Sequence, residues 1–343
     1  MDKLNVGIIG YGWVATAHIP AINASDLANV THLYSSREHN DEELSKKWGS
    51  DITSYTDLDE MLADDDLDVV SICSYNYQHK EQAVKAANAG KHIILEKPMA
   101  LYWEDCLEIE KAVKKADVNF TICFECRYSN QYLSSKAIVD EGIIGELHFG
   151  EIDYYHGIGP QYGQFEWSRK SREHGGGGSA LLTGGCHALD ALLLFMGSDV
   201  EEVTSYDTKT KSKLFEPYEF NTTSVTILKF KSGKIGKCTA AVGCIQPYYF
   251  HTHLLGSEGS LLDNKLHSDK LKSDKSNWSE LSMKMLDSGD VSDHPYEAQF
   301  NTFFESIRDN VEMPLTGLKQ AMKTHEIIFA ADKSAETGKT VKL

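Results

Sequence analysis

The sequence predicts an α/β chain in two parts: a doubly wound parallel sheet, then an α+β domain with a large, mostly antiparallel open sheet. Three observations predict it. Short apolar segments alternate with helical ones through about residue 125, a glycine-rich turn follows the first of them, and longer strand-like segments take over after about residue 127. The 343 residues suit two domains, at roughly 100–200 residues each. We place the domains at 1–125 and 126–343.

The first part contains apolar runs that end at glycine or turn residues, the pattern of buried parallel strands. We expect strands at 5–10, 30–34, 68–73, 92–95 and 119–124. Helices are expected at 15–24, 41–48, 79–89 and 102–116, with another helix beginning after 56–60, which has an N-terminal capping pattern. Strands and helices that alternate in this way form right-handed crossovers and a doubly wound sheet.

The second part contains longer segments with strand character. We expect strands at 147–155, 201–207, 222–230, 234–242 and 251–256, with Gly233 supplying the positive φ of a hairpin turn. Helices are expected at 131–141, 180–196, 296–310 and 318–337. The polar segment 263–293 lacks periodicity and is expected to form surface loops and irregular strands.

Composition excludes several classes of function. Lys and Arg number 34 against 51 Asp and Glu, a net charge of −17, which disfavours nucleic acid and membrane surfaces as partners. Every apolar run is far shorter than the ~20 residues that cross a bilayer. The first residues lack the apolar core of a secretion signal, and the seven cysteines are an odd number lying mostly in apolar segments. We therefore predict free thiols and a cytoplasmic protein.

The turn after the first strand fits a dinucleotide-binding fingerprint. Gly10 allows a tight turn, Gly12 lets pyrophosphate approach the backbone, and Ala15 lets helix and strand pack closely. The helix N-terminus then faces the anion, so the intervening Tyr11, Trp13 and Val14 are also expected at the cofactor. The alternative is a glycine-rich turn without a ligand.

The end of the second strand bears on the choice between NAD and NADP. NAD sites usually have an acidic residue there, for the ribose 2′-hydroxyl. This chain has Ser35, Ser36 and Arg37, and no carboxylate before Glu38. Hydroxyls and a guanidinium suit a 2′-phosphate, so NADP is favoured over NAD. Alternatively, Arg37 stacks on adenine or faces solvent.

Several motifs, in order, resemble the Gfo/Idh/MocA family of nicotinamide-dependent oxidoreductases, which includes glucose–fructose oxidoreductase and inositol dehydrogenase. The resemblance covers essentially the whole chain. It rests on the fingerprint, Ser74-Tyr-Asn76 through His79, Glu96-Lys97-Pro98, Gly142-Ile-Ile-Gly145, Trp167-Ser-Arg169, the glycine run 175–178, and Gly185-Cys-His187-Ala-Leu-Asp190.

The resemblance implies an N-terminal Rossmann domain and a C-terminal domain whose open sheet mediates a homodimer or homotetramer. It also implies that Lys97 lies by the nicotinamide and substrate, that His187 is the acid/base, and that Glu96 helps hold the nicotinamide ribose. The Lys97–Pro98 bond is often cis in this family. Cofactor contacts are further expected from Ser74, Asn76, His79, Arg127, Trp167 and Arg169.

The chemistry expected of these residues agrees with hydride transfer. An alcohol that loses hydride must also lose its hydroxyl proton, which an imidazole can accept near neutral pH. A neighbouring lysine can polarise the oxygen. Asp190 follows His187 by three residues and can orient the imidazole, or brace the domain instead. His18 and His79 are assigned to packing or loop hydrogen bonds, and no catalytic metal is predicted.

One position departs from the family pattern. Many members carry aspartate four residues before the histidine, where this chain has the uncharged Thr183. This weakens an assignment to inositol dehydrogenase in particular. The expected substrate is a sugar or cyclic polyol, contacted by Lys97, Arg127, Tyr155, Thr183 and His187. Further candidates are Tyr128, Tyr154, His156, Tyr162, Trp167 and Tyr248. Two alternatives are an NAD-dependent glycosidase and a non-catalytic, cofactor-sensing regulatory protein.

Overall fold

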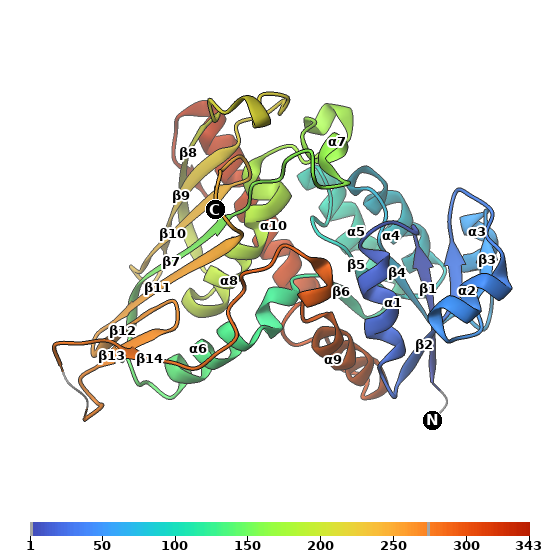
Figure 1. Cartoon of the computed structure of the whole chain (residues 1–343), viewed down its shortest axis with the longest axis horizontal. Helices are drawn as coiled ribbons and strands as arrows, with labels where there is room; N and C mark the ends of the chain where they lie inside the picture. The colour runs from blue at the N-terminus through green and yellow to red at the C-terminus, as the bar shows by residue number, and fades with distance from the viewer. Residues whose placement is uncertain (1–2, 273–274) are drawn as a thin grey trace. The chain divides into compact units, whose positions relative to one another are not determined.

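The computed structural model describes residues 3–272 and 275–343, and the chain forms two compact units (Figure 1). The first unit comprises the chain up to Glu125 together with Asp290–Met322, and the second comprises Cys126–Gly289 with Lys323–Leu343. The expectations for the extreme N-terminus, at residues 1–2, and for positions 273–274 of the loop segment lie outside the described residues.

A six-stranded parallel sheet forms the centre of the first unit, in the order β3-β2-β1-β4-β5-β6. Its strands are β1 (Leu4–Ile9), β2 (Ala28–Tyr34), β3 (Thr53–Tyr55), β4 (Val69–Ile72), β5 (His92–Leu95) and β6 (Phe120–Ile122). This order confirms the doubly wound sheet and places its switch point between β1 and β4, where such sheets bind ligands. The short edge strand β3 was not predicted.

The helices of the first unit follow the predicted alternation. They are α1 (Ala15–Asn23), α2 (Asp41–Trp48), α3 (Leu58–Leu62), α4 (His79–Asn88) and α5 (Trp103–Ala116). The bounds of α2 follow from local chemistry. The Asn40 side chain accepts a hydrogen bond from the Glu43 backbone N–H at its start, and Gly49 takes a left-handed conformation with φ 72° at its end.

Residues 290–322, which we call the return segment, pack with the first unit although the sequence analysis assigned them to the second domain. The segment contains η6 (Val291–Asp293) and α9 (Tyr296–Arg308), and α9 packs on α1. Gln299 donates to the carbonyl of Ile122 over 2.7 Å, and the Ile122 N–H donates to the carbonyl of Thr316 over 2.9 Å. The carboxyl end of β6 is thus bonded to residues far along the chain.

The second unit contains a nine-stranded sheet in the order β14-β13-β12-β11-β7-β10-β9-β8-β15. Its pairs are antiparallel except that between β7 and β10. This confirms the mostly antiparallel sheet. The strands are β7 (Leu147–Tyr155), β8 (Val200–Thr208), β9 (Thr223–Phe230), β10 (Ile235–Ala241), β11 (Tyr249–Gly256), β12 (Gly259–Leu262), β13 (Lys265–Ser268), β14 (Ser279–Glu280) and β15 (Val341–Lys342).

Helices lie on one face of this sheet (Figure 1). They include α6 (Asn130–Asp140), α8 (Cys186–Met196) and the C-terminal part of α10 (Leu318–Thr337); short helices are η2 (Glu125–Tyr128), α7 (Phe165–Ser168), η3 (Arg172–His174) and η5 (Lys213–Phe215). The helix expected at 180–196 begins instead with a π-helical turn, η4 (Leu181–Gly185). A Cβ on Gly150 would lie 2.8 Å from the Met196 sulfur, so this glycine lets α8 approach β7 closely.

None of the helices in residues 3–272 and 275–343 is both long enough and apolar enough to span a bilayer. The seven cysteines are free thiols, and all except the half-buried Cys244 are buried. Cys123 and Cys126 have the spacing of a redox pair, but both are buried free thiols. Burial raises the pKa of the Cys123 thiol well above its usual value, which fits an inert buried thiol.

Candidate active site

The glycine-rich turn links β1 to α1 at the switch point of the parallel sheet. Gly10 has φ 94°, and a Cβ there would lie 2.9 Å from the Ser74 Cα, so only glycine suits this position. A Cβ at Gly12 would meet nothing within 4 Å. The turn therefore combines a tight backbone crossing at Gly10 with open space at Gly12, ahead of a helix N-terminus. This geometry fits the pyrophosphate of a dinucleotide.

Polar and cationic side chains gather around Tyr11, which lies in the turn between β1 and α1. The Tyr11 hydroxyl accepts hydrogen bonds from Lys47 Nζ over 2.9 Å and from Trp48 Nε1 over 3.0 Å. His39 packs edge-on against the Tyr11 ring, 5.2 Å between centroids. The Ser35 hydroxyl accepts from the Arg37 backbone N–H over 3.3 Å. The predicted Ser35–Arg37 segment thus follows a strand next to the glycine-rich turn.

The loop after β4 is tied to the loop after β5. The Ser74 hydroxyl donates to Gln82 Oε1 over 2.5 Å, and Asn76 begins the short helix η1 (Asn76–Gln78). His79 is fully buried, with Nδ1 2.8 Å from the carbonyl of Pro98 and Nε2 3.3 Å from that of Ser74. Burial lowers the pKa of His79. These contacts match the expected loop hydrogen bonds, and they connect two segments expected at the cofactor.

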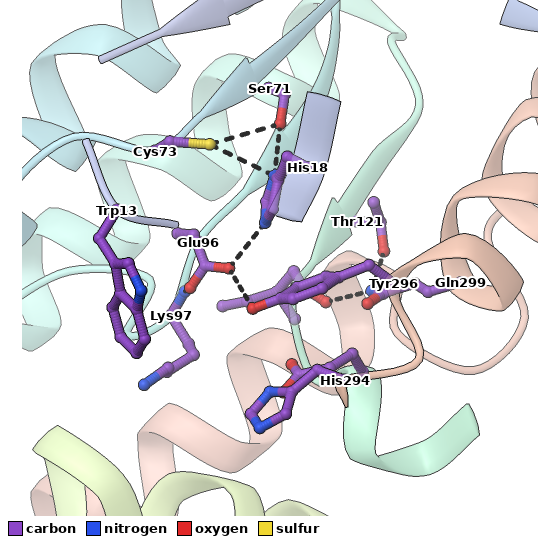
Figure 2. Close-up of polar contacts among 12 residues, drawn as sticks. Trp13, His18, Ser71, Cys73, Glu96, Lys97, Thr121, His294, Tyr296 and Gln299 are labelled. Carbon is purple, nitrogen blue, oxygen red and sulfur yellow. Dashed lines mark hydrogen bonds and ion pairs between the residues drawn. The ribbon is translucent and has the colours of Figure 1, made fainter. Parts of the chain in front are cut away.

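Glu96 and Lys97 follow β5, at the same sheet edge as the glycine-rich turn. The Lys97–Pro98 peptide bond is cis, as the resemblance implied. Glu96 is 5% exposed, and its carboxylate faces His18 and Tyr296 (Figure 2). His18 Nε2 lies 3.0 Å from Glu96 Oε1, the Tyr296 hydroxyl donates to the same oxygen over 3.2 Å, and the Lys97 backbone N–H donates to Oε2 over 3.0 Å. The half-buried Lys97 side chain leads away from this carboxylate (Figure 2).

Electrostatics favour the ionised form of this pair. Burial alone would raise the pKa of Glu96, but the hydrogen bond and charge of His18, with the charge of Lys97, hold that pKa below its usual value. Burial alone would lower the pKa of His18, but the charge and hydrogen bond of Cys73, and those of Glu96, raise it to about 10. His18, which the sequence assigned to packing, is therefore the partner of a predicted cofactor residue.

In the second unit, His187 and Thr183 lie one turn apart where η4 meets α8. His187 is 3% exposed, and its Nδ1 lies 3.7 Å from Cys126 Sγ. The Thr183 hydroxyl is buried, and no described side chain or backbone group forms a hydrogen bond with it. A Cβ on Gly184 would lie 2.4 Å from the Tyr154 ring, and one on Gly185 would lie 2.3 Å from the Ala240 Cβ. These glycines let the π-helical turn press onto the sheet.

Asp190 forms a buried ion pair with Arg127, which joins two predicted site residues of the second unit. Arg127 Nε donates to Asp190 Oδ2 over 2.5 Å and Nη2 donates to Oδ1 over 2.8 Å. The Thr324 hydroxyl also donates to Oδ1, over 2.9 Å. Both carboxylate oxygens thus accept hydrogen bonds that brace the start of the unit against α8 and α10. This arrangement corresponds to the bracing role that the sequence left open for Asp190.

Tyr154 and Tyr155 lie on opposite faces of β7. Tyr154 contacts Gly184 and donates or accepts a hydrogen bond with His156 Nδ1 over 2.8 Å. Tyr155 stacks on Tyr249, and its hydroxyl donates to Asp153 over 3.1 Å. The structure therefore does not bring Tyr155 together with Thr183 and His187. Alternation along β7 indicates that two tyrosines face opposite ways, but it does not say which faces the helix.

The segment around Trp167 and Arg169 packs against the glycine run. A Cβ on Gly176 would lie 2.5 Å from the carbonyl of Trp167. Arg169 Nη2 donates to Glu166 Oε2 over 2.7 Å, and Lys170 Nζ lies 4.1 Å from the Trp167 ring. The glycine run therefore serves close packing within the second unit. Its contribution to the cofactor, and that of Trp167 and Arg169, stays a prediction.

In the described parts of the chain, each unit has within itself one group of His, Cys or carboxylate donor atoms that lie within 4.8 Å of one another. In one, His18 and Glu96 already bond to each other beside Cys123. In the other, on the sheet of the second unit, Glu151 joins His251 and His253, but Lys237 Nζ lies 2.6 Å from its carboxylate. Each carboxylate thus already has a cationic or hydrogen-bonding partner.

Comparison with protein families matches both units. A model described as oxidoreductase family, NAD-binding Rossmann fold, matches residues 4–124, and one described as GFO/IDH/MocA C-terminal domain matches residues 132–262. The chain belongs to the GFO/IDH/MocA oxidoreductase family. This confirms the resemblance and the nicotinamide dinucleotide cofactor, and makes the first unit the NAD-binding domain of an oxidoreductase.

Relatives in this family have different activities. Myo-inositol 2-dehydrogenase of Thermotoga maritima is 25% identical over 99% of this chain and 98% of that protein. 2,7-Anhydro-N-acetylneuraminate hydratase of Escherichia coli is 29% identical over 59% of this chain and 52% of that protein. The scyllo-inositol dehydrogenase structure from Lactobacillus casei, with NAD(H) and scyllo-inositol, has a TM-score of 0.81 over 99% of each chain; at 20% identity it supports the fold alone.

Proposed function

We propose that this protein is an NAD(P)-dependent dehydrogenase or reductase that moves hydride between a nicotinamide and a secondary alcohol of a sugar or cyclic polyol. The observation that supports this most directly is the arrangement at the parallel sheet edge. The open Gly12 position and the Glu96–Lys97 segment both follow carboxyl ends of strands, where ligands bind in such sheets. Similarity to a myo-inositol dehydrogenase across nearly all of both chains supports the substrate class.

The roles of the residues follow from their chemistry. The cofactor accepts or donates hydride when bound. The Lys97 ammonium polarises the substrate oxygen and stabilises the negative charge that develops on it. The His187 imidazole accepts the hydroxyl proton during oxidation and returns it during reduction. The Thr183 hydroxyl is buried one turn before His187 and offers a hydrogen bond to a substrate hydroxyl. Asp190 acts as a positioning residue through Arg127 and α8.

The test is a screen of sugars, cyclic polyols and their keto forms with both cofactors, followed by absorbance of the reduced nicotinamide. We expect turnover with a cyclic polyol or sugar. A panel without turnover, combined with tight cofactor binding, would favour the cofactor-sensing alternative.

We propose further that NADP is the preferred cofactor. Ser35, Ser36 and Arg37 follow β2 without a carboxylate among them, and Lys47 bonds to Tyr11 in the adjacent turn. Arg37→Ala should weaken NADPH binding about tenfold or more while NADH binding changes little, since a guanidinium–phosphate contact is lost only with NADP. Fluorescence titration of both reduced cofactors measures this. Equal weakening of both would refute the phosphate assignment.

A second candidate function is a reaction without net oxidation, in which a tightly held nicotinamide oxidises and then reduces the same substrate. The similarity to a hydratase favours it. The NAD-dependent glycosidase foreseen from the sequence belongs to the same class. Cofactor that stays bound through purification, and turnover without added cofactor, would support this version. A strict requirement for added NAD(P) would exclude it.

We also propose that a second copy of the chain covers the face of the nine-stranded sheet opposite α8, as a homodimer or homotetramer. Val225, Ile227, Ile235 and Tyr206 are exposed on the same face of neighbouring strands. Light scattering after size exclusion measures the mass. Ile227→Lys should shift the mass towards the monomer, and a monomeric wild-type protein would refute this proposal. A cytoplasmic location stays a prediction from the cysteine content.

A further inference from the structure

Glu96 is a buried carboxylate whose two oxygens are held from three directions (Figure 2). Oε1 accepts hydrogen bonds from His18 on α1 and Tyr296 on α9, and Oε2 accepts from the Lys97 backbone. A buried carboxylate is costly without partners, so these contacts decide both its position and its charge. Two of the three donors come from residues that the proposed chemistry does not use.

His18 is itself fixed on its other side. Its Nδ1 lies 2.8 Å from the Ser71 hydroxyl and 3.3 Å from Cys73 Sγ, both at the end of β4. Its ring packs against Tyr296, 4.6 Å between centroids, and Phe300, 4.9 Å. The imidazole therefore bridges β4 to Glu96 through its two nitrogens, while aromatic rings fix its plane.

The charge of Glu96 acts on Lys97. Lys97 lowers the pKa of Glu96, and this interaction is mutual, so an ionised Glu96 favours the protonated Lys97 ammonium. Loss of the Glu96 charge, or a displacement of its carboxylate, would thus weaken the ammonium that is needed to polarise the substrate oxygen.

We propose that His18 and Tyr296 are positioning residues that hold the Glu96 carboxylate against the Lys97 backbone and thereby set the place and charge of the Lys97 ammonium. This inference rests on the proposed function for its kinetic consequence. The structural part, a His18–Glu96 pair completed by Tyr296 of the return segment, stands on the contacts alone.

Several other titratable groups face this pair and are part of its pH response. They are Cys73 after β4, His79 on α4, Cys123 after β6, Glu125 on η2 and His294, which bonds to Glu125 over 2.9 Å. A test must therefore change the His18–Glu96–Tyr296 contacts without altering these neighbours.

Tyr296→Phe makes the smallest such change, because it removes one hydroxyl and keeps the ring packed against both His18 and Phe300. We expect turnover to fall about three- to tenfold and the alkaline limb of the pH–rate profile to move to lower pH. The cofactor dissociation constant should change little. The matched control is Tyr249→Phe, which removes a hydroxyl bonded to Asp263 over 2.6 Å in the other unit and should leave the profile unchanged.

His18→Gln is the second variant, since an amide donor can reach Glu96 without supplying charge. Because it removes a positive charge near the Lys97 ammonium while Glu96 stays ionised at alkaline pH, it should move the alkaline limb to higher pH, opposite to Tyr296→Phe. If this buried substitution prevents folding, the kinetic part of the proposal is tested with Tyr296→Phe alone. A profile that does not move in Tyr296→Phe would overturn the kinetic part of the proposal.

Histidine NMR tests the pair without turnover. In the cofactor-free protein, His18 should give imidazolium resonances at pH 8, and its pKa should fall in Glu96→Gln, because one of the groups that raise it is lost. A neutral His18 in the wild-type protein at pH 7 would overturn the ion pair. If no substrate is turned over, the proposed function fails, whereas the NMR result still decides whether His18 and Glu96 are paired.

Discussion

Each unit buries one carboxylate beside a candidate catalytic residue, but the two carboxylates have different partners. Glu96 precedes Lys97 and bonds to a histidine and a tyrosine. Asp190 follows His187 and bonds to an arginine and a threonine. Arginine keeps its charge at every accessible pH, and its planar fork binds both carboxylate oxygens. Histidine provides charge only while protonated.

The difference shows that two buried carboxylates can form ion pairs of different kinds. With arginine the charge of the pair is permanent, and with histidine it depends on pH. The Arg127–Asp190 pair resembles a permanent brace between η2 and α8. The His18–Glu96 pair couples the first unit to pH, and it lies next to the residue proposed to polarise the substrate. Four experiments, in order of decreasing expected effect, test this difference between the two carboxylates.

The largest effect is expected from Lys97→Ala. Loss of an ammonium that stabilises developing charge should lower turnover about 100- to 10,000-fold. Cofactor affinity should change only slightly. Steady-state kinetics and fluorescence titration measure the two quantities. The control is Lys85→Ala, which removes an exposed lysine that pairs with Asp59 on the surface. Normal turnover in Lys97→Ala would remove the catalytic role from the first unit.

Arg127→Ala should destabilise the protein by about 3–5 kcal/mol, because it leaves Asp190 as a buried charge without its arginine. Urea unfolding measures this loss. Arg308→Ala, which breaks an exposed pair with Asp309, is the control and should have little effect. If the two variants unfolded alike, Asp190 would not depend on Arg127 for its burial.

The stability of the first unit should fall as the pH rises above neutrality. The pKa of His18 is raised from 6.5 to about 10 in the folded protein, so its stabilising charge is fully present below pH 6.5 and is lost as the pH passes through 10. Glu96→Gln should flatten this dependence, whereas Arg127→Ala should not. Hydrogen exchange from pH 6 to 10, resolved by segment, measures it. Parallel curves for wild type and Glu96→Gln would contradict the ionised pair.

Asp190→Asn should have the smallest kinetic effect. Loss of a negative charge one turn from His187 lowers an imidazole pKa and moves the acid limb of the pH–rate profile to lower pH. Because Arg127 offsets most of that charge, we expect about half a pH unit or less. A larger shift would mean that Asp190 orients the imidazole directly. An unchanged limb would leave Asp190 as a brace only.

Much of the fold follows from local patterns in the sequence. The bounds of α2 and β7 match the predicted 41–48 and 147–155. A capping residue and a terminal glycine mark those of α2. The edge strand β3 is only three residues long, too short to show the two-residue alternation that identifies a strand. The π-helical turn η4 depends on glycines pressed against Tyr154 and Ala240, which are remote in the sequence.

The residues of the candidate site that belong to local sequence motifs were predictable. Those that tertiary packing brings to the site were less so. The fingerprint and the Glu96-Lys97-Pro98 motif indicate their own places. By contrast, the partner of Glu96 was missed: His18 lies on an apolar helix and looks like a core residue until α9 brings Tyr296 beside it. The sequence analysis named Tyr155 as a substrate contact and Tyr154 as a further candidate, and alternation along the strand does not say which of the two faces the helices.

The return segment has a consequence for biosynthesis. Ribosomes synthesise a chain from its N-terminus to its C-terminus, and domains generally fold as units during synthesis. Here the partners of Glu96 and of Ile122 include Tyr296 and Gln299, which emerge only after the whole nascent sheet from β7 to β14. The nucleotide-binding unit is therefore begun first and completed last. Expression of residues 1–125 alone would yield a domain with an unfinished interior.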